Sequence, residues 1–125
     1  MDAATYRKRF NEKDFQRQIT KLAGMYRWTF YHNPYSLGSD TGYPDLTLVH
    51  QDFDKLWIEV KGPKGRIHPD QVKWLAWINA GPTGLAIVAF PDDLEAVGEL
   101  LQGNPVDIYE HEGVLRVRLP GSEDQ

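Results

Sequence analysis

The fold of this chain is decided by the stretch from 43 to 61, Tyr43-Pro44-Asp45-Leu46-Thr47-Leu48-Val49-His50-Gln51-Asp52-Phe53-Asp54-Lys55-Leu56-Trp57-Ile58-Glu59-Val60-Lys61. Two apolar runs rich in strand-forming residues, 46–49 and 56–60, flank a short polar segment. This pattern predicts a β-hairpin. A turn centred on Asp52 would place Asp45 directly opposite Glu59, and Tyr43 opposite Lys61.

The two faces of this hairpin differ in chemistry, because side chains alternate along a strand. One face carries Asp45, Glu59 and Lys61. The other carries apolar side chains that can pack into a core: Leu46, Leu48, Leu56, Ile58 and Val60. The pairing is a hypothesis about register, since a slip of one residue in the turn would separate the two acids.

Helical and strand patterns continue on both sides of the hairpin. A helix is predicted from 11 to 26, with Asn11 as its N-cap and Glu12 on the same stripe as the apolar residues. A strand (28–32) and a loop (33–42) follow. Beyond the hairpin we expect a helix from Pro69, a buried strand (85–90), a third helix (92–101) and a final hairpin (106–109 with 114–118). The order predicts one α/β domain, 1–125, with a mixed sheet flanked by helices.

The composition fits a compact globule of one domain. The chain has 125 residues, of which 41% are apolar and 26% charged. It has no cysteine, which excludes disulfides, thiolate metal sites and a cysteine nucleophile. No apolar run reaches the roughly 20 residues that cross a bilayer, and no secretory signal precedes the first helix. We therefore expect a cytoplasmic protein with no membrane contact.

Charge is unevenly distributed along the chain. The formal net charge is −4, yet the first 90 residues hold 12 Lys and Arg against 9 Asp and Glu, and the remaining 35 hold 2 against 9. An acidic total therefore does not exclude a polyanionic partner, because the local field decides binding. On charge alone, a solvated surface is the simpler interpretation.

The facing acids of the hairpin predict a catalytic metal site. Like charges opposite each other destabilise a sheet unless a cation holds them together. Mg²⁺ takes one or two carboxylates and keeps several waters. Lys61 beside such an ion could hold an attacking water or offset charge on a phosphate, as hydrolysis of a phosphodiester requires. Taken singly, Pro44-Asp45 is common turn chemistry and Glu59-Val60-Lys61 is typical of an exposed edge strand.

These segments resemble the VRR-NUC (virus-type replication-repair nuclease) domain of the PD-(D/E)xK nuclease superfamily. The resemblance is carried by Gly42-Tyr43-Pro44-Asp45-Leu46-Thr47-Leu48-Val49 and by Trp57-Ile58-Glu59-Val60-Lys61-Gly62-Pro63-Lys64-Gly65-Arg66-Ile67-His68-Pro69-Asp70-Gln71. It extends over about 11–90 and implies a restriction-endonuclease-like core. Two positions depart from the pattern: His68 stands where Ser or Thr often caps the helix, and Leu75 stands where related nucleases have Tyr.

The resemblance implies a role for each residue of the motif. Asp45 and Glu59 would bind the metal, Mg²⁺ or Mn²⁺, together with the backbone carbonyl of Val60. Lys61 would orient water or stabilise the transition state. Glu12 matches an acid that the family carries on its first helix, and Gln71 matches a glutamine that supports the site or positions substrate.

Two groups of basic residues are candidate DNA contacts. Lys64 and Arg66 flank the proposed metal site, and Arg7, Lys8 and Arg9 could form a basic arm; unpaired surface charge is the alternative for both. The four histidines show no metal-ligand spacing.

The resulting hypothesis is a metal-dependent DNA endonuclease. Likeness to stand-alone phage and bacterial members implies branched substrates such as four-way junctions, in a bacterial or phage-infected cell. One active site per small domain implies a homodimer if two strands are cut together. A non-cleaving nucleic-acid-binding accessory protein is the first alternative, and an interaction protein in which Glu59-Val60-Lys61 is only an edge strand is the second.

Overall fold

The computed structural model describes residues 3–34 and 42–122, with side chains described from Glu12 onward. The predicted loop 33–42 and the last three residues therefore lie largely outside the described residues. The elements are, in order, α1 (Ala3–Met25), β1 (Thr29–His32), β2 (Leu46–Val49), β3 (Leu56–Val60), α2 (Pro69–Asn79), β4 (Leu85–Ala89), the 3-10 turn η1 (Pro91–Asp93), α3 (Leu94–Leu101), β5 (Asp107–His111) and β6 (Val114–Arg118).

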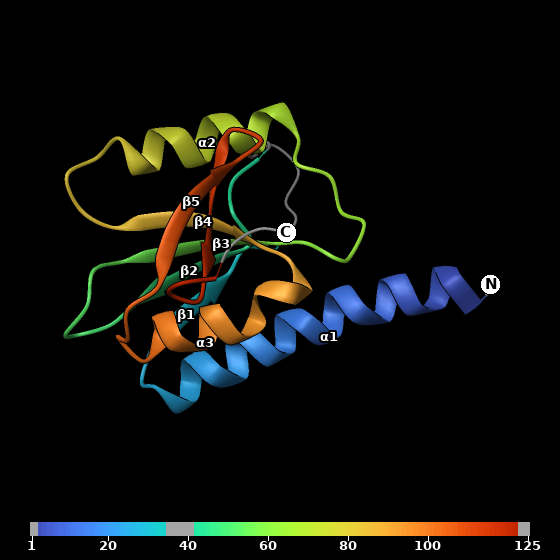
Figure 1. Cartoon of the computed structure of the whole chain (residues 1–125), viewed down its shortest axis with the longest axis horizontal. Coiled ribbons are helices and arrows are strands. Elements are labelled where there is room, and N and C mark those ends of the chain that lie inside the picture. Colours follow the sequence, from blue (N-terminus) through green and yellow to red (C-terminus); the bar gives the residue numbers. More distant parts are fainter. Residues whose placement is uncertain (1–2, 35–41, 123–125) are drawn as a thin grey trace.

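A four-stranded mixed sheet forms the centre of the molecule. Its order is β1-β2-β3-β4, with antiparallel pairing except between β3 and β4, which are parallel. In Figure 1, α2 lies over one face of this sheet, and α1 and α3 lie against the other. The parallel step from β3 to β4 requires the α2 crossover. The predicted α/β architecture with a mixed sheet flanked by helices is confirmed, and it is consistent with a restriction-endonuclease-like core.

The hydrophobic core has two parts, one on each face of the sheet. The larger part joins β2 and β3 to α1 and α3, and its fully buried members include Ile19, Leu48, Ile58 and Val97. The smaller part lies under α2 and contains Leu75, Ala86, Val88 and Val114. β4 contributes to both faces, which explains its continuous apolar sequence.

The register of the central hairpin is the one that the sequence pattern predicts. Thr47 pairs with Trp57, and the ladder continues through Leu46↔Ile58 and Leu48↔Leu56. The apolar residues of β2 and β3 therefore turn toward α1, whereas Trp57 and Glu59 turn toward α2.

Two helix boundaries differ from the prediction. α1 begins at Ala3 rather than at Asn11, so Asn11 lies inside the helix and is not its N-cap. The preceding residues contain Ala, Arg and Lys but no Gly or Pro, so nothing in them ends a helix. The third helix is preceded by η1, in which Asp93 Oδ2 accepts a hydrogen bond from the Phe90 N–H at 3.0 Å.

The C-terminal hairpin closes the β4 side of the sheet. Its β6 strand packs against β4, and Val114 and Val117 are buried. Arg116 forms two hydrogen bonds with Asp93, at 2.8 and 3.1 Å, which tie the hairpin to η1. The acidic last third of the chain is therefore an integral part of the domain.

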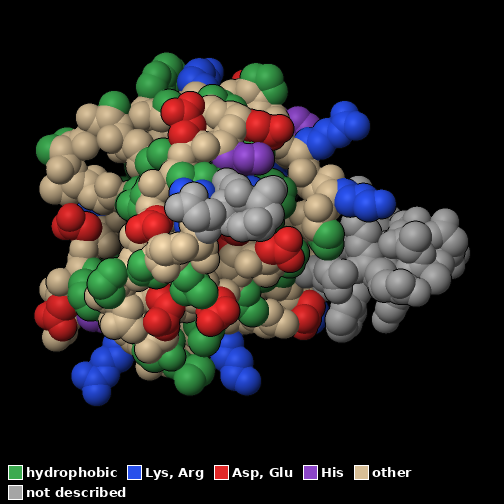
Figure 2. All heavy atoms as spheres, in the orientation of Figure 1, with side chains coloured by type: hydrophobic (Ala, Val, Ile, Leu, Met, Phe, Trp, Pro, Cys, Tyr) green, Lys and Arg blue, Asp and Glu red, His purple; other side chains and the backbone are tan. Residues whose placement is uncertain are grey.

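Acidic and basic side chains are unevenly distributed on one face of the molecule. On the face shown in Figure 2, Asp and Glu side chains are spread over the centre and most Lys and Arg side chains lie at the rim.

None of the helices in the described ranges is long and apolar enough to span a membrane.

Candidate active site

The predicted acids and lysine meet where β3 leaves the sheet. Glu59 is 5% exposed and Lys61 7% exposed, a burial that charged side chains rarely reach without partners. Lys61 Nζ lies 3.4 Å from Glu59 Oε2. Because Glu59 projects toward α2, this buried ion pair lies between the sheet and the start of that helix.

Gln71, in the first turn of α2, connects both members of the pair. Its Oε1 accepts a hydrogen bond from Lys61 Nζ at 2.8 Å, and its Nε2 donates to Glu59 Oε2, also at 2.8 Å. The same Oε1 accepts the His68 N–H at 3.0 Å, which fixes the side chain to the helix start. His68 provides no side-chain cap, yet α2 begins at Pro69 as predicted.

Asp45 reaches the site from the residue before β2. Its Oδ2 accepts the backbone N–H of Val60 at 2.8 Å, so the carboxylate crosses from β2 to β3. Its own carbonyl oxygen accepts the Asn33 N–H at 2.7 Å, which extends the pairing of β1 with β2. These two bonds hold Asp45 beside Glu59, as the predicted register requires.

The two carboxyl groups perturb each other. Burial raises the pKa of Glu59 to about 8, and the neighbouring charge of Asp45 adds to this effect, while Lys61 opposes it. Burial also raises the pKa of Asp45, although the Val60 N–H and the hydrogen bond with Glu59 favour its charged form. The two carboxyl groups therefore titrate as a coupled pair, and both pKa values are raised.

The donor set fits a hard divalent cation. Lys61 and Gln71 both contact Oε2 of Glu59, and Val60 contacts Oδ2 of Asp45. The two carboxyl groups also hydrogen-bond to each other. Two carboxylate oxygens, a backbone carbonyl and waters suit Mg²⁺ or Mn²⁺. The described residues contain no cluster of three or more His, Cys, Asp or Glu that would hold a metal, so an ion here would depend on these two acids.

An aromatic cluster formed by Tyr43, Trp57 and Trp74 adjoins the site. The Tyr43 hydroxyl lies 3.1 Å from Thr47 Oγ1 and accepts the Trp57 Nε1–H at 3.1 Å. Its ring meets Trp74 of α2 edge-on, with centroids 5.1 Å apart. Sequence analysis did not assign Tyr43 a role, although the register already placed it on the face of the acids.

Two glycines, Gly65 and Gly42, allow close packing of the segments around the site. A Cβ on Gly65 would lie 3.0 Å from Lys61 Cβ, so the loop after β3 packs directly on the lysine side chain. Gly42 has φ +94°, and a Cβ there would lie 2.6 Å from the Asp70 carbonyl carbon. The segment before Asp45 therefore rests on the first turn of α2, where a cavity of about 360 Å³ is lined by Gly42, His68, Pro69, Asp70 and Gln71.

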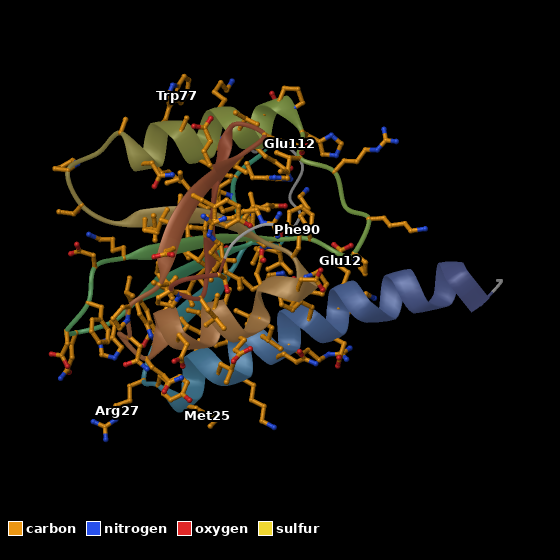
Figure 3. The ribbon with its side chains drawn as sticks, viewed as in Figure 1. Glu12, Met25, Arg27, Trp77, Phe90 and Glu112 are labelled. Carbon is orange, nitrogen blue, oxygen red and sulfur yellow. The ribbon has the colours of Figure 1, made fainter. Side chains whose placement is uncertain are left out.

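The remaining predicted residues lie around this centre. Glu12 is exposed on α1, and Figure 3 shows it on the side of that helix turned toward the sheet. The structure gives it no hydrogen bond to Asp45 or Glu59. Lys64 and Arg66 are exposed in the β3–α2 connection. The predicted basic arm, Arg7–Lys8–Arg9, is part of α1; its side chains lie outside the described residues.

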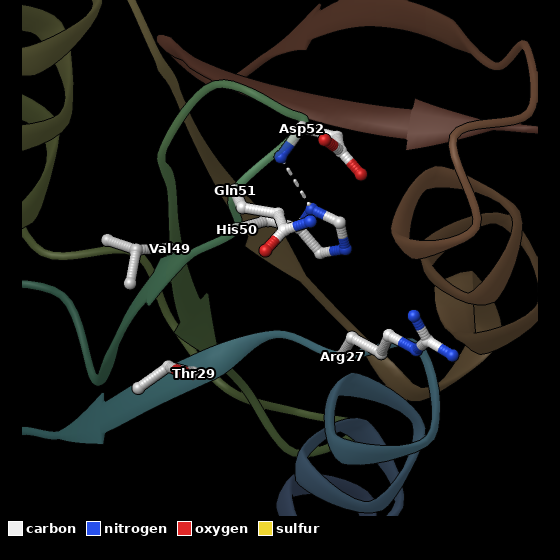
Figure 4. Close-up of a pocket in the computed structure, with 6 residues that line it drawn as sticks. All are labelled: Arg27, Thr29, Val49, His50, Gln51 and Asp52. Atoms are coloured by element: carbon white, nitrogen blue, oxygen red, sulfur yellow. Dashed lines mark hydrogen bonds between the residues drawn. The ribbon is translucent and has the colours of Figure 1, made fainter.

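A second cavity, of about 380 Å³, lies at the opposite end of β2 and does not belong to this chemistry. Figure 4 shows the residues that line it, Arg27, Thr29, Val49, His50, Gln51 and Asp52. His50 Nδ1 accepts the Asp52 N–H at 3.0 Å, and Nε2 lies 3.0 Å from the Tyr26 carbonyl oxygen. Both ring nitrogens have structural partners, so His50 shows no sign of a catalytic role.

Comparison with known proteins identifies the family of this chain. A search of curated proteins found no match to the chain. The family model described as the VRR-NUC domain matches residues 12–87, a range that includes Glu12, Asp45, Glu59, Lys61 and Gln71. Because the match covers more than half of the sequence, the chain belongs to the VRR-NUC domain family, which places it in a nuclease superfamily.

Proposed function

We propose that this protein is a Mg²⁺- or Mn²⁺-dependent endonuclease that hydrolyses phosphodiester bonds in DNA. The observation that carries the proposal is the group formed by the buried Glu59 and Lys61 and the half-buried Asp45. Two adjacent acids that are largely removed from water destabilise the fold, and their raised pKa values express that cost. Such perturbed groups are concentrated at functional sites.

Asp45 and Glu59 would hold the cation through their carboxylate oxygens, together with the carbonyl of Val60. A bound divalent ion lowers the pKa of water and offsets charge on a phosphate. Glu59 must lose its proton to act as a ligand. Lys61, already within 3.4 Å of Glu59, would hold the attacking water or stabilise the charge that develops on the phosphate.

Gln71 acts as a positioning residue in this scheme. Its amide contacts both Lys61 and Glu59, so it fixes the ammonium group relative to the carboxylate. Glu12 is a further candidate ligand. It is exposed and on the sheet side of α1, and a change of rotamer or bound DNA would have to bring it to the ion.

The proposed substrate is branched duplex DNA, such as a four-way junction, bound by a homodimer that supplies one site per strand. Lys64 and Arg66 are suited to contact the DNA backbone, because they are exposed in the loop that follows Lys61. Arg7, Lys8 and Arg9 would add contacts from α1. We place this activity in the cytoplasm of a bacterial or phage-infected cell.

The test is cleavage of labelled linear, forked and four-way DNA with and without Mn²⁺. We expect metal-dependent cuts, with preference for the branched substrates. Asp45→Ala should abolish cleavage, and Lys61→Ala should slow it by about 10²–10³-fold. Asp54→Ala removes an exposed acid in the β2–β3 turn and serves as the matched control.

Intact cleavage in Asp45→Ala would overturn the proposal. DNA binding that is sensitive to salt but indifferent to divalent metal, without cleavage, would instead identify a non-cleaving accessory protein.

A further inference from the structure

The two edge strands of the central sheet, β4 and β1, differ in how they are covered by the described residues. At the β4 edge, the C-terminal hairpin packs against the sheet through β6. At the other edge, β1 pairs with β2 on its inner side, and no strand of the described ranges pairs with its outer side. All four residues of β1 are exposed, including Phe30 at 41% and Tyr31 at 61%.

The direction of the free backbone groups of β1 follows from one hydrogen bond. Asn33 N–H donates to the Asp45 carbonyl, and the β1–β2 register places these two residues opposite each other. Hydrogen-bonded pairs alternate with non-bonded pairs along an antiparallel ladder. Residues 29, 31 and 33 therefore bond toward β2, whereas Phe30 and His32 direct their N–H and C=O groups outward.

We infer that this edge pairs with the β1 strand of a second copy of the chain. In antiparallel pairing about a two-fold axis, Phe30 of each copy would exchange both backbone hydrogen bonds with the partner's His32. Tyr31 would then lie directly opposite the partner's Tyr31, as a non-hydrogen-bonded pair. This register uses every outward donor and acceptor of β1.

The side chains favour a second copy over another occupant. Phe30 would face an imidazole on the α1 face of the sheet, and the two tyrosines would meet on the α2 face; aromatic cross-strand pairs stabilise sheets. β1 carries no Lys, Glu, Asp or Pro to discourage edge pairing. In a chain of net charge −4, an uncharged strand is also where two copies repel each other least.

The pairing would deepen the proposed function, on which its consequence for cleavage rests. A continuous sheet formed about this axis keeps the α2 faces on the same side, so both acid clusters would open toward one DNA molecule. Strand spacing and rise place the two Asp45 residues on the order of 20 Å apart. The contact is smaller than a standard interface, so we expect a concentration-dependent dimer.

Cysteine cross-linking tests the register directly, because the chain has no cysteine of its own. Non-bonded antiparallel pairs bring Cα atoms to about 4.5 Å, within reach of a disulfide. Tyr31→Cys should therefore form a covalent dimer under mild oxidation. Phe30→Cys should not, since the two copies of residue 30 lie two residues out of register. Trp77→Cys, at a side chain 64% exposed on α2, controls for random collision.

A charge swap provides an independent measurement by sedimentation. Tyr31→Lys and Tyr31→Glu should each be monomeric, and an equal mixture of the two should restore the dimer. Trp77→Lys should behave like the wild type. Circular dichroism checks that each variant is folded.

Cross-linking of Tyr31→Cys that is no faster than that of Trp77→Cys would overturn the inference. So would a Tyr31→Lys variant that sediments like the wild type. A wild type that sediments as a monomer would also overturn it, and a change of its DNA affinity on Tyr31→Lys would then identify the β1 edge as a DNA contact. None of the oligomer measurements needs metal or DNA, so their failure is distinguishable from failure of the nuclease assignment.

Discussion

At the scale of single residues, Glu59 is the group whose chemistry depends most on its surroundings. Its pKa in the folded, metal-free protein is about 8, against an ordinary value of 4.5. Between these two pH values the folded state binds more protons than the unfolded state, so the free energy of unfolding falls as pH rises. The stabilising contribution is fully present below pH 4.5 and is lost above pH 8. Asp45, whose pKa is also raised, acts in the same direction.

We therefore expect Glu59→Gln to flatten this pH dependence and to be more stable than the wild type at alkaline pH. Urea unfolding at a series of pH values in a chelator measures it. A wild type whose stability rises from pH 5 to pH 8 more steeply than that of Glu59→Gln would contradict the assignment of the pKa.

Gln71 gives a second prediction at this scale. Gln71→Ala removes the amide that joins Lys61 to Glu59, and loss of such supporting contacts costs about 10–100-fold in activity or metal affinity. We expect kcat to fall by this factor, with the pH–rate profile shifted because Glu59 loses a hydrogen-bond donor. Steady-state cleavage across pH measures both. An unchanged profile with full activity would exclude a positioning role.

The same residues show what sequence reasoning can and cannot reach. The placement of Asp45, Glu59 and Lys61 on one face follows from alternation and from the length of the turn, which are local properties. The hydrogen bonds of Gln71 to Lys61 and Glu59 depend on how α2 packs on the sheet. No spacing rule predicts that the oxygen and the nitrogen of one side-chain amide contact two different residues. Likewise, Glu12 lies on the correct helix face by periodicity, yet its distance from the acids depends on how α1 crosses the sheet.

At the scale of elements, the loop between β3 and α2 holds Lys61 in place. A Cβ added at Gly65 would lie 3.0 Å from Lys61 Cβ and 3.1 Å from Lys61 Cδ. The Gly65 N–H donates to the Gly62 carbonyl oxygen at 3.0 Å. Gly65→Val should push Lys61 away from Glu59 and reduce kcat, while the thermal midpoint changes little, because the loop is outside the main core. Activity and melting measured on one sample separate these effects.

Gly24→Ala is the matched control for that variant, because no atom lies within 4 Å of the added methyl group and Ala suits a helix. Full activity in Gly65→Val would show that Lys61 is not held by the loop.

The elements themselves were predictable to different extents. β2, β3 and α2 have clear periodicity and turn residues, and their positions agree with the prediction. The predicted start of α1 was wrong. Asn11 is a typical N-cap residue, but the residues before it continue the helix. The predicted strand 28–32 was also one residue too long, because β1 begins at Thr29. Trp28 leaves the sheet to bury its ring and donate Nε1–H to the Leu101 carbonyl at 2.9 Å, a contact across 73 residues.

At the scale of the whole molecule, Arg116 ties the C-terminal hairpin to the rest of the domain, and we expect the two to unfold together. Asp93 is 6% exposed and is bonded by Arg116, whose guanidinium also lies over the Phe90 ring at 4.6 Å. Arg116→Ala leaves the Asp93 carboxylate without this charge partner and should destabilise the fold by about 3–5 kcal/mol. Chemical denaturation measures the loss. A single shifted transition is expected, whereas an early transition of the hairpin alone would show that it folds independently.

In the proposed function, Asp45 and Glu59 together would hold one divalent ion. Isothermal titration with Mn²⁺ tests it most directly, because it requires neither DNA nor catalysis. We predict one ion per chain for the wild type, with affinity that increases as pH rises through about 8 because Glu59 must release its proton. We predict loss of that binding in Asp45→Asn and in Glu59→Gln. Mn²⁺ binding that is unchanged in either variant, or absent from the wild type above pH 8, would contradict the account.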